Sequence, residues 1–290
     1  MTGIPNFDSL FRLDGKVAFI TGGSRGLGFD IAAAFLQAGA SKVIINARKE
    51  AGLQRAAQDL NSIPNVRGRA SFIAGNVNTM ESVEKLVAAV KEEVPRGRLH
   101  ILVNNAGASW GGSFEDYEDW KTAKTFDVNV RGPFNLTRKL VPLLAAAGTP
   151  SDPARVIIIS SVGGIAVTHV GRDGAIAYSI SKAAMHHFGR NLALELAPKN
   201  ITTNVIAPGW FPTRLANPAI EKYGGLDAAS ADNPMGRLGL REDIAGTAVY
   251  LCSKAGAYVN GEDITLDGGK RLLGGNSNSH QTDAKRIARL

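Results

Sequence analysis

Short apolar runs alternate along the chain with longer segments whose apolar positions recur every three or four residues. The short runs are rich in β-branched side chains, as in "ARVIIIS", and this is typical of strands buried on both faces. The predicted strands cover residues 16–21, 42–46, 70–75, 99–107 with the turn that follows, 154–160, 200–209 and 262–266. The predicted helices cover residues 27–39, a segment ending near Leu60, and 80–94, 114–131, 133–147, 177–197 and 241–252.

This alternation predicts an α/β fold, because parallel strands need a crossover segment between them and helices supply it. We expect a single doubly wound Rossmann-type domain with a parallel sheet of about seven strands. The domain is predicted to cover residues 1–272, and residues 273–290 form a polar C-terminal tail. Ligands of such sheets bind beyond the carboxyl ends of the strands.

The composition agrees with one globular domain and excludes several classes of protein. The chain has 290 residues, of which 44% are hydrophobic and 20% charged. It has no apolar run of the roughly 18 residues that a membrane helix needs, and its N-terminus does not resemble a signal peptide. The single cysteine, Cys252, excludes an internal disulfide and a cysteine metal cluster, and fits a reducing compartment.

The net charge is +7 and the isoelectric point about 9.6. Lys and Arg are scattered among acidic residues and are not interleaved with aromatic ones, so we expect no nucleic-acid partner. A ligand that carries phosphate groups explains an excess of cations equally well.

A glycine-rich turn, "TGGSRGLG" at residues 21–28, joins the first predicted strand to the first predicted helix. Gly22, Gly26 and Gly28 allow a sharp turn and a close approach of the backbone to a pyrophosphate, which the helix N-terminus attracts. A purely structural turn is the alternative. The strand-turn-helix context favours a dinucleotide site.

Two cations near this turn indicate which dinucleotide is bound. Arg25 lies within the turn, and Arg48 follows the second strand, where an NAD site usually places an acidic residue. Here Asn46 and Ala47 stand at that place. We interpret Arg25 and Arg48 as a clamp for the 2′-phosphate of NADP(H), and two solvated arginines are the alternative.

Tyr178 and Lys182 lie four residues apart in "AYSISKAAM", within a predicted helix. This spacing puts the phenol and the ammonium on one helix face. Taken alone, the pair fits an exposed helix face as well as a catalytic site.

Taken together, these motifs resemble the short-chain dehydrogenase/reductase family. The chain has TGxxxGxG at 21–28, NNAG at 104–107, Asn129 in "DVNVRG", YxxxK at 178–182 and "PGWFPT" at 208–213, in the family's order. Within the family, "NNAGASWGG", "VIAPGWFPTRL" and "PMGRLG" look most like the NADPH-dependent 3-oxoacyl reductases of the rhamnolipid pathway. The resemblance covers most of the chain.

The resemblance implies a catalytic tetrad of Asn129, Ser161, Tyr178 and Lys182. Tyr178 acts as general acid and base, and Lys182 lowers its pKa and binds the nicotinamide ribose. A serine hydroxyl holds the substrate carbonyl, and we choose Ser161 over Ser160 because the family uses the second serine of such a pair. Asn129 fixes a water that relays protons to Lys182.

The resemblance also implies a set of residues that bind NADP(H). Asn76 departs from the aspartate that the family often has after the third strand, although an amide can still bind adenine. The set is Gly22, Ser24, Arg25, Gly26, Leu27, Gly28, Arg48, Asn76, Val77, Asn104, Asn105, Ala106, Gly107, Tyr178, Lys182, Pro208, Gly209, Phe211 and Thr213.

The segment after the sixth predicted strand has the apolar, proline and glycine content of a mobile lid. Trp110, Phe211, Leu215 and Tyr223 are candidates to line an apolar pocket, and core or subunit contacts are the alternative for each. An apolar lid favours a fatty-acyl thioester or another hydrophobic ketone. The inserted residues 169–174 before Tyr178 are interpreted as an active-site loop.

Other polar residues carry no prediction of a metal site. His169, His186 and His187 have no metal-like spacing, and we expect core or surface histidines. The acidic Glu115, Asp116 and Asp119 are interpreted as a helix start, where negative charge is favourable.

The last three residues, Ala288, Arg289 and Leu290, are similar to the S-K-L peroxisomal signal. We expect a peroxisomal protein read by the import receptor, with the cytoplasm as the alternative.

The function that we predict is NADPH-dependent reduction of a ketone to a secondary alcohol, with a 3-oxoacyl thioester as the candidate substrate. The alternatives are an alcohol or polyol dehydrogenase acting on a secondary metabolite or sugar acid, and a dinucleotide-binding regulator without turnover. The family resemblance also implies a homodimer or homotetramer.

Overall fold

The structure of the protein is a computed structural model, and it describes residues 3–4, 6–167 and 170–273. A seven-stranded parallel sheet with the order β3-β2-β1-β4-β5-β6-β7 forms its centre, which confirms the predicted fold class. The strands are β1 (Val17–Thr21), β2 (Lys42–Ala47), β3 (Arg69–Ala74), β4 (Ile101–Asn104), β5 (Ala154–Ile159), β6 (Ile201–Pro208) and β7 (Asp263–Leu266).

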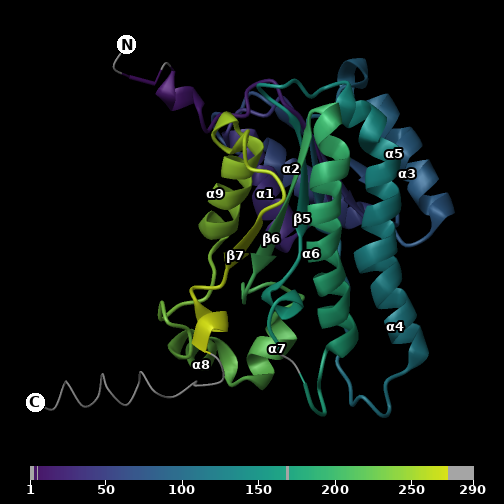
Figure 1. Cartoon of the computed structure of the whole chain (residues 1–290), viewed down its shortest axis with the longest axis vertical. Coiled ribbons are helices and arrows are strands. Elements are labelled where there is room, and N and C mark those ends of the chain that lie inside the picture. The colour runs from purple at the N-terminus through teal and green to yellow at the C-terminus, as the bar shows by residue number, and fades with distance from the viewer. Residues whose placement is uncertain (1–2, 5, 168–169, 274–290) are drawn as a thin grey trace, which may run out of the picture.

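Helices cover both faces of this sheet (Figure 1). One layer contains α1 (Gly26–Gln37), α2 (Glu50–Asn61) and α9 (Arg241–Cys252). The other contains α3 (Met80–Glu93), α4 (Asp119–Phe126), α5 (Gly132–Ala145) and α6 (Ile176–Leu196).

Side chains alternate between the two layers along each central strand, because successive residues of a strand point to opposite faces. In β5, Ile157 and Ile159 pack with α1 and α9, whereas Val156 and Ile158 pack with α5 and α6. Both faces of β5 are therefore buried, and this explains the apolar run Val156–Ile159 that makes up most of the strand.

The strand order reverses between β1 and β4, and the turns that follow β1, β4, β5 and β6 meet at one edge of the sheet. A doubly wound sheet opens a crevice for a ligand at such a point. Beyond the end of β6 lie two short helices, α7 (Asn217–Lys222) and α8 (Gly225–Ala231), in the lower part of Figure 1. The sequence pattern did not reveal these helices.

One predicted helix differs from the structure at its start. The helix predicted from residue 114 begins at Asp119, so Glu115 and Asp116 precede it, and the interpretation of these two acids as a helix start was wrong. Ser113 donates a hydrogen bond to Glu115 over 2.7 Å, and this local turn competes with helix formation. The helix then passes through a π-helical turn at Asp127–Arg131 before α5 begins.

The opposite edge of the sheet, at the amino ends of the strands, contains a buried group of charges. Lys16 Nζ lies 2.7 and 2.8 Å from the carboxylate oxygens of Asp152. Arg155 is completely buried, and its guanidinium donates to Asp152 and to the carbonyls of Pro153, Leu251 and Ser253. These charges are paired within the protein.

Within the part of the chain that the structure describes, no helix is both long and apolar enough to cross a membrane. The predicted tail lies outside the described residues from Gly274 onwards, as do His169 and the tripeptide Ala288, Arg289 and Leu290.

Candidate active site

The glycine-rich turn is held in shape by an asparagine from the neighbouring strand. Asn105 donates from Nδ2 to the carbonyl oxygens of Thr21 and Gly22, over 2.9 and 3.1 Å. A Cβ on Gly28 would lie 2.4 Å from that same Nδ2, so only glycine fits there. Gly22 and Gly26 have φ of 69° and 56°, the left-handed region that glycine tolerates.

The turn faces the segment after β6. A Cβ on Gly26 would lie 3.5 Å from Cγ2 of Thr213, which brings the first predicted cofactor segment next to the last. Gly209 continues the ladder by donating its N–H to Leu266 over 2.7 Å, so the backbone after Pro208 is fixed at the sheet edge. Ser24 and Leu27 are half-buried, and Leu27 packs against the core.

The two candidate cations at this end of the sheet are exposed. Neither Arg25 nor Arg48 forms an ion pair with a described residue. Asn46 occupies the position where an NAD site usually has an acidic residue. Its side chain is buried and donates to the carbonyl oxygens of Ile73 and Gly75. The Asn46 amide therefore links β2 to the end of β3. The guanidinium groups of Arg25 and Arg48 stay available for an anion.

Two other predicted cofactor residues have side chains engaged inside the protein. Asn104 is buried and donates to Thr137 Oγ1 over 2.9 Å, so its side chain points into the core and not toward a cofactor. Asn76 accepts from the N–H of Val77, which is itself buried. Only their backbone groups, or a rearranged Asn76 amide, could contact a dinucleotide.

Tyr178 and Lys182 lie together on the inner face of α6, as their spacing predicted. Lys182 Nζ is 5.6 Å from the centre of the Tyr178 ring. It donates to the carbonyl oxygen of Ile159, at the end of β5, over 2.8 Å. Burial lowers the pKa of Lys182 to about 8, because a buried ammonium loses its hydration.

The pKa of Tyr178 differs from our expectation. Burial raises it above the ordinary value, and a hydrogen bond with Ser161 opposes this rise. The prediction that Lys182 lowers the pKa of Tyr178 is therefore wrong for this structure: the lysine lies beside the ring and donates to Ile159, and desolvation of the phenol is the larger effect.

The two serines after β5 have different surroundings. Ser160 is buried and donates to the carbonyl of Lys182 over 2.9 Å. Ser161 is half-buried, accepts from the N–H of Gly163 at 3.1 Å and forms the hydrogen bond with Tyr178. The structure thus brings Ser161, and not Ser160, to the phenol.

Asn129 lies in the π-helical turn, and its side chain joins two other segments. Its Oδ1 accepts from the N–H of Ala108 over 2.8 Å, and its Nδ2 donates to the carbonyl of Ala108 and to Ser181 Oγ, both over 2.9 Å. The amide thereby holds the loop after β4 against α6. Its donors and acceptor are engaged with protein, so any relay from Asn129 to a water would use its backbone.

Gly107 connects this tetrad to the cofactor segments. A Cβ at Gly107 would lie 3.6 Å from Asn129 Oδ1 and 3.7 Å from Lys182 Nζ. The NNAG segment thus contacts the glycine-rich turn through Asn105 and lies beside the Lys182 ammonium at Gly107. The missing side chain of Gly107 leaves space next to that ammonium.

Comparisons with known proteins agree with this geometry. Residues 22–271 match a family model described as "Enoyl-(Acyl carrier protein) reductase". A relative, the rhamnolipids biosynthesis 3-oxoacyl-[acyl-carrier-protein] reductase of Pseudomonas aeruginosa, is 40% identical over 90% of this chain and 98% of its own.

The chain belongs to the short-chain dehydrogenase/reductase family.

Solved structures of the family superpose closely. One, described as the Pseudomonas aeruginosa RhlG/NADP active-site complex, has a TM-score of 0.84 and 40% identity over 91% of this chain and 99% of that one. Another is a gluconate 5-dehydrogenase from Burkholderia cenocepacia in complex with NADP and tartrate, with a TM-score of 0.78 and 27% identity over 90% and 97% of the two chains. The predicted family and the likeness to 3-oxoacyl reductases of rhamnolipid biosynthesis are confirmed, and this short-chain dehydrogenase/reductase is an oxidoreductase.

The predicted substrate residues of this oxidoreductase lie on two segments that flank the crevice. Trp110, after β4, packs edge-on against Trp120 with ring centres 5.6 Å apart. Tyr223, on α7, packs edge-on against Trp210 at 4.9 Å, and Leu215 is 52% exposed. Trp210 was missed by the sequence reasoning, although it stands inside the quoted "PGWFPT" motif.

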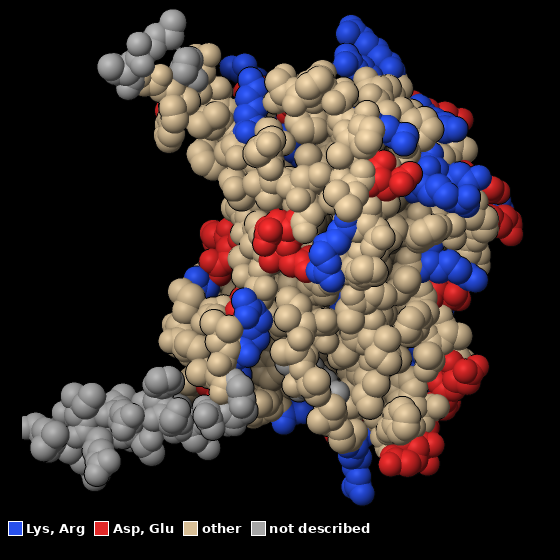
Figure 2. All heavy atoms as spheres, in the orientation of Figure 1, with Lys and Arg blue, Asp and Glu red and all other residues tan. Residues whose placement is uncertain are grey.

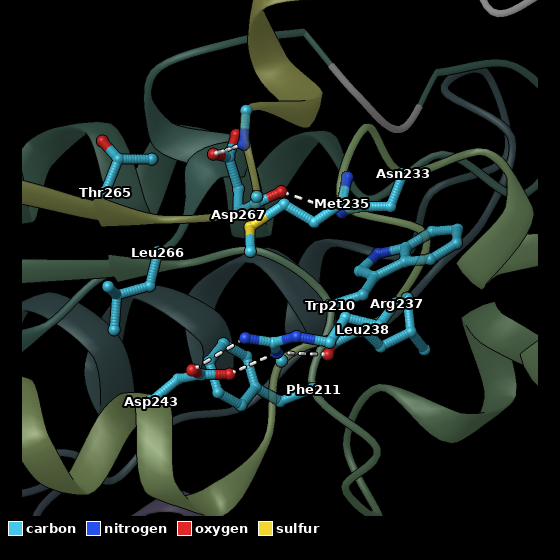
Figure 3. Close-up of a pocket in the computed structure, with 13 residues that line it drawn as sticks. Trp210, Phe211, Asn233, Met235, Arg237, Leu238, Asp243, Thr265, Leu266 and Asp267 are labelled. Carbon is cyan, nitrogen blue, oxygen red and sulfur yellow. Dashed lines mark hydrogen bonds and ion pairs between the residues drawn. The ribbon is translucent and has the colours of Figure 1, made fainter.

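Beside the lid segment lies a cavity of about 380 Å³, shown in Figure 3. Arg237 and Asp243 form a two-point ion pair within it, over 2.6 and 3.0 Å. Phe211 is buried and fills the space beneath Gly239, where a Cβ would lie 2.4 Å from its ring. None of the tetrad lines this cavity, so it adjoins the crevice without forming the catalytic centre.

The loop before α6 touches both flanking segments. Lys222 on α7 pairs with Asp173 over 2.6 Å, and the N–H of Gly112 donates to the carbonyl of Gly174 over 3.0 Å. Asp173 and Gly174 therefore contact α7 and the loop after β4, and the interpretation of residues 169–174 as an active-site loop stays a prediction.

Proposed function

We propose that this short-chain dehydrogenase/reductase catalyses NADPH-dependent reduction of a ketone to a secondary alcohol, and that a 3-oxoacyl thioester is its substrate. The observation that carries the proposal is the grouping of the Tyr178 phenol, the Ser161 hydroxyl and the buried Lys182 ammonium at one point of the crevice. The 40% identical relative, a 3-oxoacyl-[acyl-carrier-protein] reductase by name, supports the substrate class.

NADP(H) fits the residues around the crevice. Gly22 and Gly28 let the turn pack tightly against Asn105 at the α1 N-terminus, where a Cβ would clash, and Arg25 and Arg48 are exposed and form no ion pair with a described residue. The turn would hold the pyrophosphate and the arginines the 2′-phosphate. When bound, the cofactor supplies the hydride.

Tyr178 is the proton donor to the carbonyl oxygen of the substrate. Burial raises the pKa of this phenol above its ordinary value, which favours the proton-donating form that reduction needs. Ser161 orients the same oxygen through its hydroxyl. Lys182 remains protonated below its pKa of about 8 and stabilises negative charge that develops above it.

The experiment that tests the function follows NADPH oxidation with purified protein and a series of ketones. Turnover of 3-oxoacyl thioesters with long chains, and weaker turnover of sugar acids and small polyol ketones, is expected. Indifference to 3-oxoacyl thioesters but oxidation of polyols would favour the alcohol or polyol dehydrogenase. NADPH binding with no turnover of any ketone would indicate a regulator.

A second experiment tests the phosphate clamp. Arg48→Asp should weaken NADP(H) binding by about tenfold or more and NAD(H) binding far less, since one charge-assisted contact to the 2′-phosphate is worth ~1.5–3 kcal/mol. Lys49→Asp, at the next exposed position, is the matched control. Equal weakening of both dinucleotides by Arg48→Asp would refute the clamp.

A homo-oligomer is supported by apolar side chains that stand on the outer helices. Phe134, Ile180 and Leu194 are 50%, 52% and 81% exposed on α5 and α6. Light scattering would measure a dimer or tetramer, and a monomer at micromolar concentration would contradict the proposal.

Peroxisomal import rests on Ala288, Arg289 and Leu290, which lie outside the described residues. An N-terminal fluorescent fusion should enter peroxisomes, and a fusion that lacks these three residues should stay in the cytoplasm.

No nucleic-acid partner is proposed: in Figure 2, Lys and Arg are interspersed with Asp and Glu on the face shown.

A further inference from the structure

Tyr223, the residue that follows α7, is held by an acid that follows α8. Its hydroxyl forms a hydrogen bond with Oδ2 of Asp232, and Lys270 Nζ lies 2.5 Å from the same oxygen. The side chain of Asp232 is only 13% exposed. The hydrogen bond to Asp232 and burial raise the pKa of Tyr223 to about 12, so the phenol keeps the proton that it donates. Both lid helices and the turn Lys270–Leu273 after β7 are thus joined at one carboxylate.

Two glycines bring this acid back to the tyrosine. Gly224 and Gly225, between α7 and α8, have φ of 110° and 88°, values that other residues rarely adopt. The chain therefore turns sharply, and Asp232 lies beside Tyr223 although nine positions separate them. The two helices also share a small core, made of Ile220, Ala229 and Leu238. The lid is consequently a folded unit that presents Tyr223 in one orientation.

The Tyr223 ring lies on the side of the crevice where Tyr178 stands. It packs edge-on against Trp210, just beyond the end of β6, with ring centres 4.9 Å apart. The preceding residue, Lys222, pairs with Asp173 in the loop that leads into α6. The first lid helix therefore lies between the end of β6 and the start of α6 (Figure 1). Tyr223 remains 44% exposed there.

The engaged hydroxyl decides what Tyr223 offers to a ligand. A free hydroxyl in the crevice would pair with the hydroxyl groups of a sugar or polyol, and such pairing selects strongly for polar substrates. With the hydroxyl bound to Asp232, the group that remains is the aromatic ring. Leu215, on the segment between β6 and α7, adds an apolar side chain that is 52% exposed. A surface of this kind favours an alkyl chain, because apolar area leaves water on contact.

We propose that Asp232 is a positioning residue, which together with Lys270 holds the Tyr223 ring as an apolar wall for the alkyl chain of the substrate. The proposal rests on the proposed function, the reduction of a 3-oxoacyl thioester. Asp232 itself does not touch the substrate and acts through Tyr223. Without the carboxylate, the ring loses its fixed orientation and the phenol hydroxyl becomes free. The effect falls on the selection of chain length and leaves the proton transfer at Tyr178 unchanged.

The test measures how two unreactive thioesters, decanoyl-CoA and butanoyl-CoA, bind to the full-length protein in the presence of NADP⁺, by titration calorimetry. Only the longer chain should reach the wall. Tyr223→Ala should weaken the binding of decanoyl-CoA about tenfold, through lost apolar contact, and Asp232→Ala about threefold, through a lost hydrogen bond. Both should leave butanoyl-CoA unchanged. Tyr258→Ala, at a fully exposed tyrosine, is the matched control and should change neither.

The double variant separates positioning from a general loosening of the lid. If Asp232 acts through Tyr223, Asp232→Ala should have no further effect in a protein that already carries Tyr223→Ala. Additive weakening, an equal loss of butanoyl-CoA binding in Asp232→Ala, or a wild type that binds both thioesters equally would each overturn the proposal. If the wild type binds decanoyl-CoA but reduces no ketone, the proposed function fails, and the binding measurements still decide the role of Asp232.

Discussion

Lys16 and Lys182 are equally buried, with 6% and 5% of each residue exposed, but they lie at opposite ends of the sheet. Lys16 contacts both carboxylate oxygens of Asp152, whereas Lys182 donates to a backbone carbonyl and forms no ion pair with a described residue. A buried ammonium without a carboxylate is costly, and such groups concentrate at functional sites. Lys182 is therefore the one of the two that the fold buries without a carboxylate partner among the described residues, as the proposed catalytic role of this lysine would lead us to expect.

The arginines show the same difference. Arg155 is completely buried at the amino end and donates to a carboxylate and to several carbonyls. Arg25 and Arg48 at the carboxyl end are exposed and have no ion pair with a described residue. Lys16 and Arg155 at the amino end are thus paired within the fold, whereas Arg25 and Arg48 at the carboxyl end are left available to a ligand.

The strongest test of this contrast removes the phenol. Tyr178→Phe should lower kcat by about 10²–10⁴-fold, the usual contribution of a positioned general acid, with the melting temperature nearly unchanged. Steady-state rates and thermal unfolding measure the two effects. Tyr258→Phe, at a fully exposed tyrosine, is the control. Activity within threefold of the wild type would exclude Tyr178 as the proton donor.

Replacing the two buried lysines should have opposite consequences. Lys182→Met should lower kcat/KM by at least about a hundredfold, because the charge facing the reacting oxygen is lost, while the free energy of unfolding stays equal or rises. A loss of stability with unchanged kinetics would show that Lys182 is a structural residue, and the contrast with Lys16 would fail.

The sequence was sufficient for the sheet, since the apolar run Val156–Ile159 in β5 is explained by burial on both faces. It was also sufficient for the Tyr178–Lys182 pair, which helical spacing brings together. It was not sufficient for the directions of side chains. Asn104 and Asn105 are adjacent in one motif, yet Asn104 points to Thr137 in the core and Asn105 to the glycine-rich turn. No local spacing reveals this.

Effects that depend on burial were also beyond the sequence. The expected fall in the pKa of Tyr178 follows from a neighbouring cation, but the structure adds a larger opposing effect of desolvation. The ion pair of Lys16 joins residues that are 136 positions apart. Both are tertiary properties, since they depend on which segments the fold brings together.

At the amino end, pH should act on stability and not on catalysis. Burial and the nearby Lys16 and Arg98 lower the pKa of His100 to about 4 from 6.5, and its Nδ1 accepts from the N–H of Val17 over 3.1 Å. The folded protein therefore prefers the neutral ring. Stability is complete above pH 6.5 and should fall by roughly 2 kcal/mol as pH drops through 6.5 to 4, because solvent screening at this partly exposed ring reduces the effect.

Urea unfolding across that pH range measures this loss, and the difference between wild type and His100→Gln isolates the histidine from the carboxylates that titrate nearby. The variant should show a shallower decline. Parallel curves for both proteins would mean that His100 does not contribute.

Lys16→Met should have the smallest of these effects, and it should lower the free energy of unfolding without changing catalysis. Removal of one partner from a fully buried ion pair costs ~3–5 kcal/mol, but here Asp152 is 31% exposed and keeps Arg155 at 3.2 Å, so we expect ~1–2 kcal/mol. Urea unfolding measures the change, and kcat should stay within about twofold. The double variant Lys16→Met with Asp152→Asn should lose more stability than Lys16→Met, because the completely buried guanidinium of Arg155 then also lacks its carboxylate. If Lys16→Met instead lowered kcat as strongly as Lys182→Met, the two ends of the sheet would be coupled, and the pairing of a buried lysine would no longer distinguish stability from chemistry.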